Sequence, residues 1–127
     1  NKLQSFLEYF MLNSISSTDG ASEAFYHGMM LGLCAVLGSQ YQVRSNRESG
    51  LGRFDIELLP MVKNMPGFIF ELKHTKDMNI DLDSLADSAL RQIDNMKYDA
   101  ELKAFGVDDI VKIGIAFRQK SAVVKRG

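Results

Sequence analysis

The chain has 127 residues, of which 46% are hydrophobic and 24% charged, and this globular composition excludes an intrinsically disordered protein. A formal net charge of −1 excludes long-range attraction of nucleic acid by the whole molecule, so any polyanion-binding surface must be local. The single cysteine, Cys34, excludes an intramolecular disulfide, and no apolar run approaches the roughly 20 residues of a membrane span. We therefore expect one domain over residues 1–127, located in the cytoplasm and without a membrane partner.

The N-terminal part is predicted to be helical. Apolar residues recur at helical spacing over residues 2–14, so residues 1–15 form an extra N-terminal helix. The chain starts inside this helix and without Met, from which we expect it to be the C-terminal fragment of a longer protein. Capping residues at 16–20 precede a second helix, predicted over residues 22–38 and ended by Gly38. Because this second helix is apolar on most sides, we expect it to be buried.

From residue 41 the hydrophobic period changes to two, which predicts β-strands. The predicted strands cover residues 41–46, 53–59, 68–73, 110–117 and 122–125. Polar, Gly-containing turns are expected at residues 47–50 and 63–67, so the second and third strands form a hairpin. One helix is expected over residues 81–102, before the fourth strand. This order predicts an α/β fold, a mixed sheet of four to five strands flanked by helices.

Three residues of the predicted hairpin carry the chemistry. Side chains alternate along a strand, so Glu71 and Lys73 share one face, and Asp55 lies beside Glu71 if the hairpin pairs as predicted. Two adjacent carboxylates raise each other's pKa unless a cation lies between them, and such hard oxygen ligands suit Mg²⁺ or Mn²⁺. A lysine two residues along the strand can orient or deprotonate the attacking water and offset negative charge on a phosphate.

The Glu-x-Lys pattern has a simpler interpretation when it is taken alone. It occurs by chance in a chain of this length roughly half of the time. Glu71 and Lys73 would then belong to a solvated strand edge, paired with each other across a turn. The surrounding residues favour the metal site over this alternative.

Three segments resemble the PD-(D/E)XK, or restriction-endonuclease-like, superfamily of nucleases. They are residues 52–55 (Gly-Arg-Phe-Asp), 70–73 (Phe-Glu-Leu-Lys) and 89–93 (Ala-Leu-Arg-Gln-Ile). Residues 25–28, 45–50 and 92–98 more closely resemble one bacterial family of such domains, found at the C-terminus of AAA-ATPase-like proteins. The similarity runs from about residue 23 to residue 124, and the departure from the superfamily motif is Phe54 in place of the proline before Asp55.

This resemblance implies a restriction-endonuclease-like fold and metal-dependent hydrolysis of nucleic-acid phosphodiester bonds, with DNA as the expected substrate. It implies that Asp55 and Glu71 bind Mg²⁺ or Mn²⁺ and that Lys73 is catalytic. It adds Glu23, on the first core helix, as an accessory acid and metal ligand, and Gln92 as a polar residue of the site. An N-terminal AAA-ATPase-like domain is the implied partner, and a homodimer is left open.

The superfamily also includes inactive members, so a second function stays open. The same fold could serve as a non-catalytic module that binds nucleic acid or regulates an attached AAA-ATPase-like domain. The two alternatives differ in whether Asp55, Glu71 and Lys73 converge within metal-coordination reach.

Several other polar residues have both a functional and a structural interpretation. Arg44, Arg47 and Arg53 precede Asp55 and can hold phosphate by bidentate contacts, or they can pair with neighbouring glutamates. Glu23 can reach the metal, or it can simply be favoured by the positive end of its helix. Gln92 lies at the edge of an apolar stripe and faces partly inward, where a polar group needs a partner.

Overall fold

The computed structural model describes residues 2–14, 22–36, 40–48, 52–96 and 98–127. Its elements are α1 (Lys2–Ser14), α2 (Glu23–Ala35), β1 (Tyr41–Glu48), β2 (Arg53–Pro60), β3 (Gly67–His74), α3 (Leu82–Met96), α4 (Tyr98–Ala104), β4 (Ile110–Arg118) and β5 (Ser121–Arg126). None of the helices in these segments is long and apolar enough to cross a membrane.

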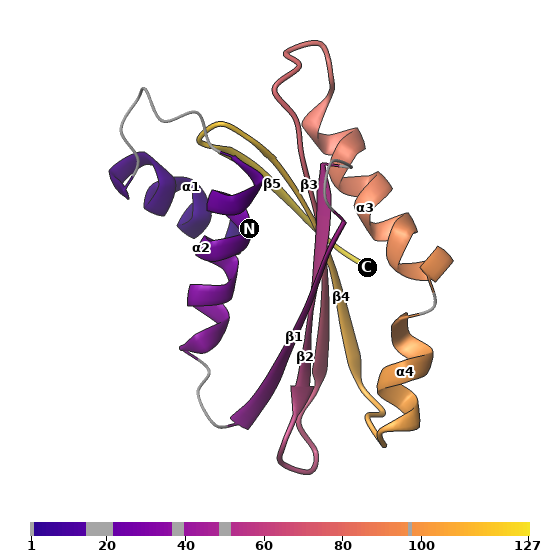
Figure 1. Ribbon diagram of the computed structural model, residues 1–127. Coiled ribbons are helices and arrows are strands. Elements are labelled where there is room, and N and C mark those ends of the chain that lie inside the picture. Colours follow the sequence, from indigo (N-terminus) through magenta and orange to yellow (C-terminus); the bar gives the residue numbers. More distant parts are fainter. Residues whose placement is uncertain (1, 15–21, 37–39, 49–51, 97) are drawn as a thin grey trace.

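The five strands form one sheet in the order β1-β2-β3-β4-β5. Neighbouring strands are antiparallel except β3 and β4, which are parallel because α3 and α4 form the crossover between them. Figure 1 shows this sheet nearly edge-on, with α1 and α2 on one side and α3 and α4 on the other. The mixed sheet flanked by helices confirms the predicted α/β fold class.

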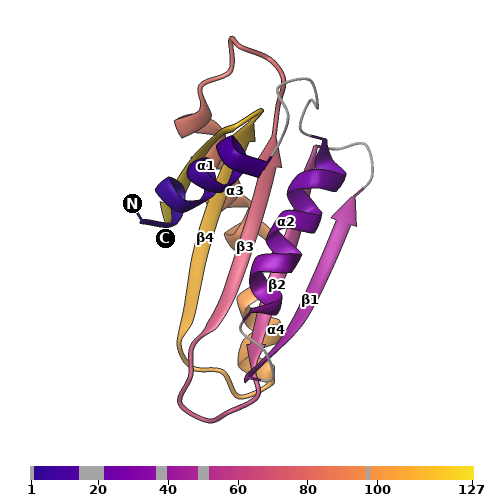
Figure 2. The ribbon, with the colours of Figure 1, turned by 90° about the vertical axis from the view of Figure 1, so that its left-hand side faces the viewer.

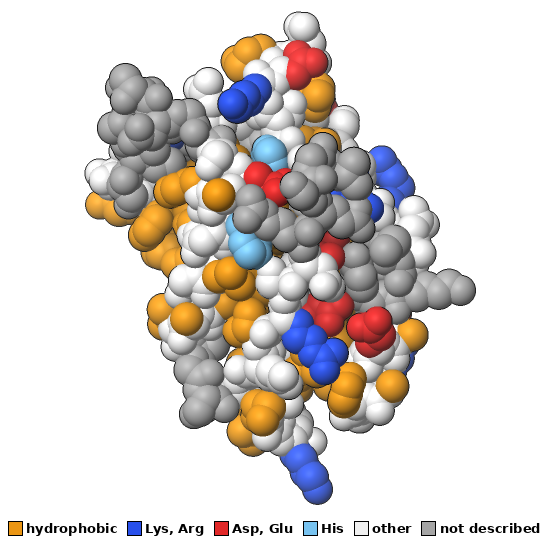
Figure 3. All heavy atoms as spheres, viewed as in Figure 1, with side chains coloured by type: hydrophobic (Ala, Val, Ile, Leu, Met, Phe, Trp, Pro, Cys, Tyr) orange, Lys and Arg blue, Asp and Glu red, His pale blue; other side chains and the backbone are white. Residues whose placement is uncertain are grey.

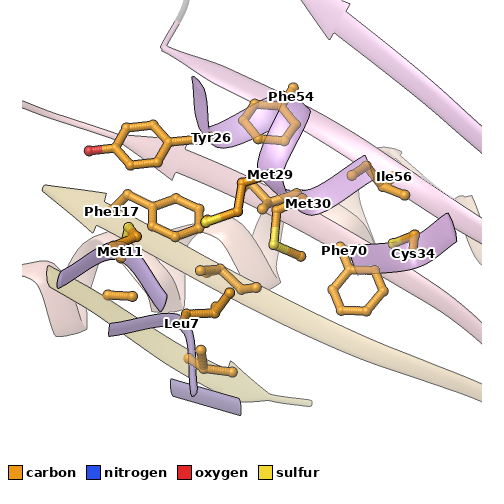
Figure 4. Close-up of a cluster of buried hydrophobic side chains, with 14 of the residues drawn as sticks. Leu7, Met11, Tyr26, Met29, Met30, Cys34, Phe54, Ile56, Phe70 and Phe117 are labelled. Carbon is orange, nitrogen blue, oxygen red and sulfur yellow. The ribbon is translucent and has the colours of Figure 1, made fainter. Parts of the chain in front are cut away.

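The larger core lies between the sheet and the two N-terminal helices. Alternate residues of β2 and β3 point to this side, and three of them, Phe54, Ile56 and Leu72, are at most 1% exposed. Figure 4 shows Phe54 and Ile56 close to labelled side chains of α2, and Figure 2 shows α2 lying along β1 and β2. Tyr26 of α2 stacks on Phe117 of β4, with ring centroids 4.4 Å apart. These contacts fix which side chains of the central strands face the opposite side of the sheet.

A smaller core lies under α3 and α4 on that opposite side. Ile93 of α3 and Leu102 of α4 pack there against Leu59 of β2 and Ile69 of β3. Phe54 and Ile56 point one way and Leu59 the other, so the odd-numbered residues of β2 face α3 and α4.

Three predictions about the helices and strands differ from the structure. Residues 47 and 48, predicted as a turn, continue β1 and pair with Phe54 and Arg53 of β2. The pairing continues because it is made by backbone hydrogen bonds, which do not depend on the polarity of the side chains. The single helix predicted over residues 81–102 is two helices, α3 and α4, and both contribute a side chain to the smaller core. The second helix ends at Ala35, and it is not buried on most sides: Ala24, Gly28 and Gly32 are exposed. The predicted breaks at residues 16–20 and 49–50 and the Gly38 cap lie outside the described residues.

Gly114 allows α3 to approach the sheet directly beside β3. A Cβ atom at this position would lie 2.6 Å from the backbone oxygen of Ala86 and 2.9 Å from the backbone nitrogen of Leu90. Gly114 is also the partner of Glu71 in the parallel register of β3 and β4. The close contact therefore determines how near α3 lies to Glu71.

We expect Gly114→Ala to destabilise the protein by about 1–3 kcal/mol, because the added methyl group meets helix backbone that cannot swing aside. Urea unfolding monitored by circular dichroism measures the loss. Gly28→Ala is the matched control: a Cβ there meets nothing within 4 Å, and alanine in a helix should stabilise by about 0.4–1 kcal/mol. Equal stability of Gly114→Ala and the wild type would contradict the close approach of α3.

Candidate active site

The centre of the site is a pair of carboxylates on two neighbouring strands in the middle of the sheet. Asp55 of β2 and Glu71 of β3 are direct partners in the antiparallel register, on the face that α3 and α4 cover. Side chains opposite each other in such a pair have Cβ atoms about 4.5–5.5 Å apart. Asp55 is 7% exposed and Glu71 is 1% exposed, so both carboxylates are held in a poorly hydrated environment. The interpretation of Glu71 and Lys73 as a solvated strand edge is therefore wrong.

Lys73 lies on the same face, one step further along β3. It is opposite Arg53 of β2 and is partly buried. Burial lowers the pKa of Lys73; the neighbouring carboxylate of Glu71 raises it, while Arg53 and Arg91 lower it. The ammonium group is thus less strongly favoured than in water, which suits a residue that orients or deprotonates a water molecule.

Two side chains from neighbouring strands contact the carboxylates. The Asn46 amide of β1 donates a hydrogen bond to Asp55 Oδ1 at 3.3 Å. Arg53 Nη1 lies 3.8 Å from Glu71 Oε1, and its side chain is 21% exposed, so it also reaches the surface beside the buried pair. Asn46 was not expected at the site. It lies in the strand predicted over residues 41–46, but its position opposite Asp55 depends on the register of β1 with β2, which the sequence pattern does not indicate.

The three arginines expected to hold phosphate are not equivalent. Arg53 lies beside Glu71, as described. Arg44 faces the same side from β1, opposite Glu57, and its guanidinium carbon lies 4.9 Å from the centre of the exposed Phe105 ring. Arg47 is opposite Phe54 in the register, and its side chain lies outside the described part.

Glu23 and Gln92 lie on helices that cover opposite sides of the sheet. Gln92 of α3 is partly buried next to Ile93, which packs on β2 and β3, and the preceding Arg91 acts on Lys73 electrostatically. Glu23 opens α2 on the opposite side of the sheet, and its Oε1 lies 3.2 Å from His74 Nε2. Within the described segments, no group of three or more His, Cys, Asp or Glu side chains is placed to hold a metal ion. The structure thus brings Asp55, Glu71 and Lys73 together and leaves the ligand role of Glu23 a prediction.

One acidic residue of this face was missed by the sequence reasoning. Glu57 follows Asp55 by two residues, faces the same side and is only 3% exposed. Burial, helped by Glu101 and Asp55, raises the pKa of Glu57 to about 7, against an opposing effect of Arg44. The alternation of side chains along the strand places Glu57 on the same face as Asp55, and this could have been noticed in the sequence. It did not indicate burial, because a glutamate on a strand is usually solvated.

The central strands, their crossover through α3 and α4, and the Asp–Glu–Lys set on one face define a restriction-endonuclease-like α/β protein. The sequence agrees with this assignment, since the sequence model of the PD-(D/E)XK nuclease superfamily matches residues 21–127. The chain belongs to that superfamily. A comparison with curated proteins finds no match.

Proposed function

We propose that the chain is a metal-dependent nuclease that hydrolyses phosphodiester bonds of DNA at Asp55, Glu71 and Lys73. One observation carries the proposal: the register of β2 and β3 places the two carboxylates side by side, and Lys73 shares their face. Superfamily membership supports nuclease chemistry in general. The choice of DNA and the roles of the individual residues are our inference.

The residues of this face fit a divalent cation of the Mg²⁺ type. Such a cation prefers hard oxygen ligands, uses one or two protein carboxylates and keeps several water molecules. Asp55 and Glu71 supply that number of carboxylates, and Asn46 adds an amide that orients Asp55. A bound Mg²⁺ or Mn²⁺ would supply Lewis acidity toward a phosphoryl oxygen. The ligands in this proposal are Asp55 and Glu71, and Glu23 is a further candidate from the other side of the sheet.

The remaining residues would act on water and on phosphate. The Lys73 ammonium orients the attacking water through Nζ and offsets the negative charge that develops on the phosphate. Arg53, which reaches the surface, binds a neighbouring phosphate, and Arg44 does the same further along β1. Gln92 positions the water from the α3 side. Each role follows from a group that lies on the face of Asp55 or borders it.

An attached AAA-ATPase-like domain and a homodimer are further proposals, which rest on the sequence resemblance. The competing function is a non-catalytic module of the same fold that binds nucleic acid or regulates such an ATPase. Buried adjacent carboxylates favour the enzyme, because a surface that only binds a polyanion gains nothing from negative charge at its centre.

A cleavage assay with the purified chain tests the proposal. Single-stranded, duplex and branched DNA, together with RNA of matched sequence, are incubated with Mg²⁺, with Mn²⁺ or with EDTA. We expect DNA products with either cation, none with EDTA and slower cleavage of RNA. Binding of these substrates without any cation-dependent product, at every protein concentration, would favour the non-catalytic module instead.

A further inference from the structure

A groove with exposed apolar side chains lies beyond the end of β2, whereas Lys73 is opposite the beginning of that strand. It has a volume of about 570 Å³ and is lined mainly by the turn between β2 and β3 and by the segment between α4 and β4. Figure 1 shows both segments at the same end of the sheet. Met61, Val62 and Phe105 line the groove and are each more than half exposed. Neighbouring apolar side chains left in water in this way mark a binding site.

The end of α4 fixes Phe105 on the wall of this groove. Gly106 follows it with a φ of 86° and donates a backbone hydrogen bond to the Lys103 carbonyl at 2.9 Å. Val107 donates another to the Leu102 carbonyl at 3.2 Å, which completes the Schellman arrangement that ends many helices. Val107 and Leu102 are both buried in the smaller core. The backbone at Phe105 is therefore firmly anchored, although the residue itself is 62% exposed.

The Phe105 ring lies beside the face of the sheet that carries Asp55. Arg44 of β1 is opposite Glu57, which follows Asp55 by two residues, or about 7 Å along the strand. The guanidinium carbon of Arg44 lies 4.9 Å from the centre of the Phe105 ring. In Figure 3, acidic, basic and apolar side chains lie side by side in the region between β1 and α4. Arg44 and Phe105 thus link the groove to the proposed active site, so a DNA strand that reaches Asp55 can also reach the groove.

The charges of the groove favour a nucleobase over a phosphate. Among the described residues that line it, Asp108 and Asp109 are acidic and Lys63 is basic. Adjacent carboxylates repel a phosphate, whereas a base is uncharged and offers N–H groups that a carboxylate accepts. Guanine presents two kinds of N–H group next to each other on its Watson–Crick edge, and thymine presents one.

We propose that this groove receives an unpaired base of the DNA substrate, stacked on the Phe105 ring, while Arg44 holds a neighbouring phosphate. Proteins that bind single-stranded nucleic acid combine aromatic side chains for the bases with basic side chains for the backbone in this way. A base inside a duplex is paired and stacked on its neighbours, so it cannot enter the groove. The inference rests on the proposed function and deepens it: the preferred substrate is DNA with unpaired bases next to the cleaved bond.

Equilibrium binding in EDTA tests this inference, because it requires neither a cation nor cleavage. Fluorescence anisotropy compares a labelled blunt duplex with the same duplex carrying a short single-stranded overhang at either end. We expect the wild type to bind one of the overhang DNAs about tenfold more tightly than the blunt duplex. Phe105→Ala should lose this difference and bind the blunt duplex as the wild type does. Phe105→Trp, which keeps an aromatic ring, should retain it.

Tyr9→Ala is the matched control, since Tyr9 is an exposed aromatic residue of α1 on the other side of the sheet. It should keep the preference for the overhang. Equal weakening of both DNAs by Phe105→Ala would show that the ring only supports Arg44, and it would overturn the inference. Unchanged binding of both DNAs would leave the groove to a protein partner and would overturn it as well. If Phe105→Ala fails to fold, Phe105→Leu removes the ring but keeps an apolar side chain, and it should lose the preference.

Overhangs that differ in one base, guanine or thymine, test the contact with the carboxylates. The wild type should bind the guanine overhang at least about fivefold more tightly. The double variant Asp108→Asn, Asp109→Asn should lose this selection and still prefer either overhang to the blunt duplex. Equal binding of the two overhangs by the wild type would overturn the contact between the base and the carboxylates.

Failure of this inference and failure of the proposed function are distinguishable. A chain that cleaves nothing but loses its overhang preference in Phe105→Ala supports the groove while the proposed function fails. A chain that cleaves DNA with Mg²⁺ but binds blunt and overhang DNA equally keeps the proposed function and loses this inference.

Discussion

Replacing Lys73 by alanine should reduce DNA cleavage by about two to three orders of magnitude, because one group that stabilises the transition-state charge is lost. The same variant should bind Mn²⁺ as the wild type does, since Lys73 shares the face of the carboxylates but supplies no oxygen ligand. Single-turnover cleavage and Mn²⁺ titration measure the two quantities separately.

Lys76→Ala is the control for this substitution. Lys76 is exposed just beyond β3, so its loss removes the same charge without changing the site. It should cleave at the wild-type rate. Equal residual cleavage by the wild type and Lys73→Ala would point to a contaminating nuclease and would count against the site.

Asp55→Asn should lose both cleavage and tight binding of the cation. The substitution keeps the size of the side chain and deletes the charge that a divalent ion requires. We expect no detectable Mn²⁺ binding and a rate at least about three orders of magnitude below the wild type. Asp55→Ala should behave in the same way.

A folding measurement must accompany Asp55→Asn, because Asp55 is buried and accepts a hydrogen bond from Asn46. The asparagine oxygen can still accept this bond, so the circular dichroism spectrum should not change. If a folded Asp55→Asn binds Mn²⁺ as tightly as the wild type, the cation lies elsewhere.

The arrangement of the central hairpin could be predicted because each of its strands has one strongly apolar face. Phe54, Ile56 and Leu72 define that face, and a strand places the next residue on the other side, so the position of Asp55 beside Glu71 followed from alternation and one turn. The register itself was a condition of this prediction, and the pairing of β2 with β3 confirms it. The core of the candidate site was therefore accessible from local patterns.

The remainder of the site depends on contacts between distant segments. The Glu23–His74 contact joins residues that are 51 positions apart, and nothing in the local pattern of either segment indicates it. Asn46 contacts Asp55 because β1 pairs with β2 in a register that places the two residues opposite each other, and the local pattern of β1 does not indicate that register. Glu57 is buried on the face of the sheet that α3 and α4 cover, and the sequence did not distinguish α4 from α3.

The most direct test compares single-turnover cleavage of one labelled DNA by the wild type, Lys73→Ala and Asp55→Asn, purified identically and assayed with Mg²⁺ and with EDTA. The proposed site predicts Mg²⁺-dependent cleavage by the wild type alone, with both variants at least about a hundredfold slower although they are folded. Cleavage at the wild-type rate by either folded variant would contradict the assignment of this site.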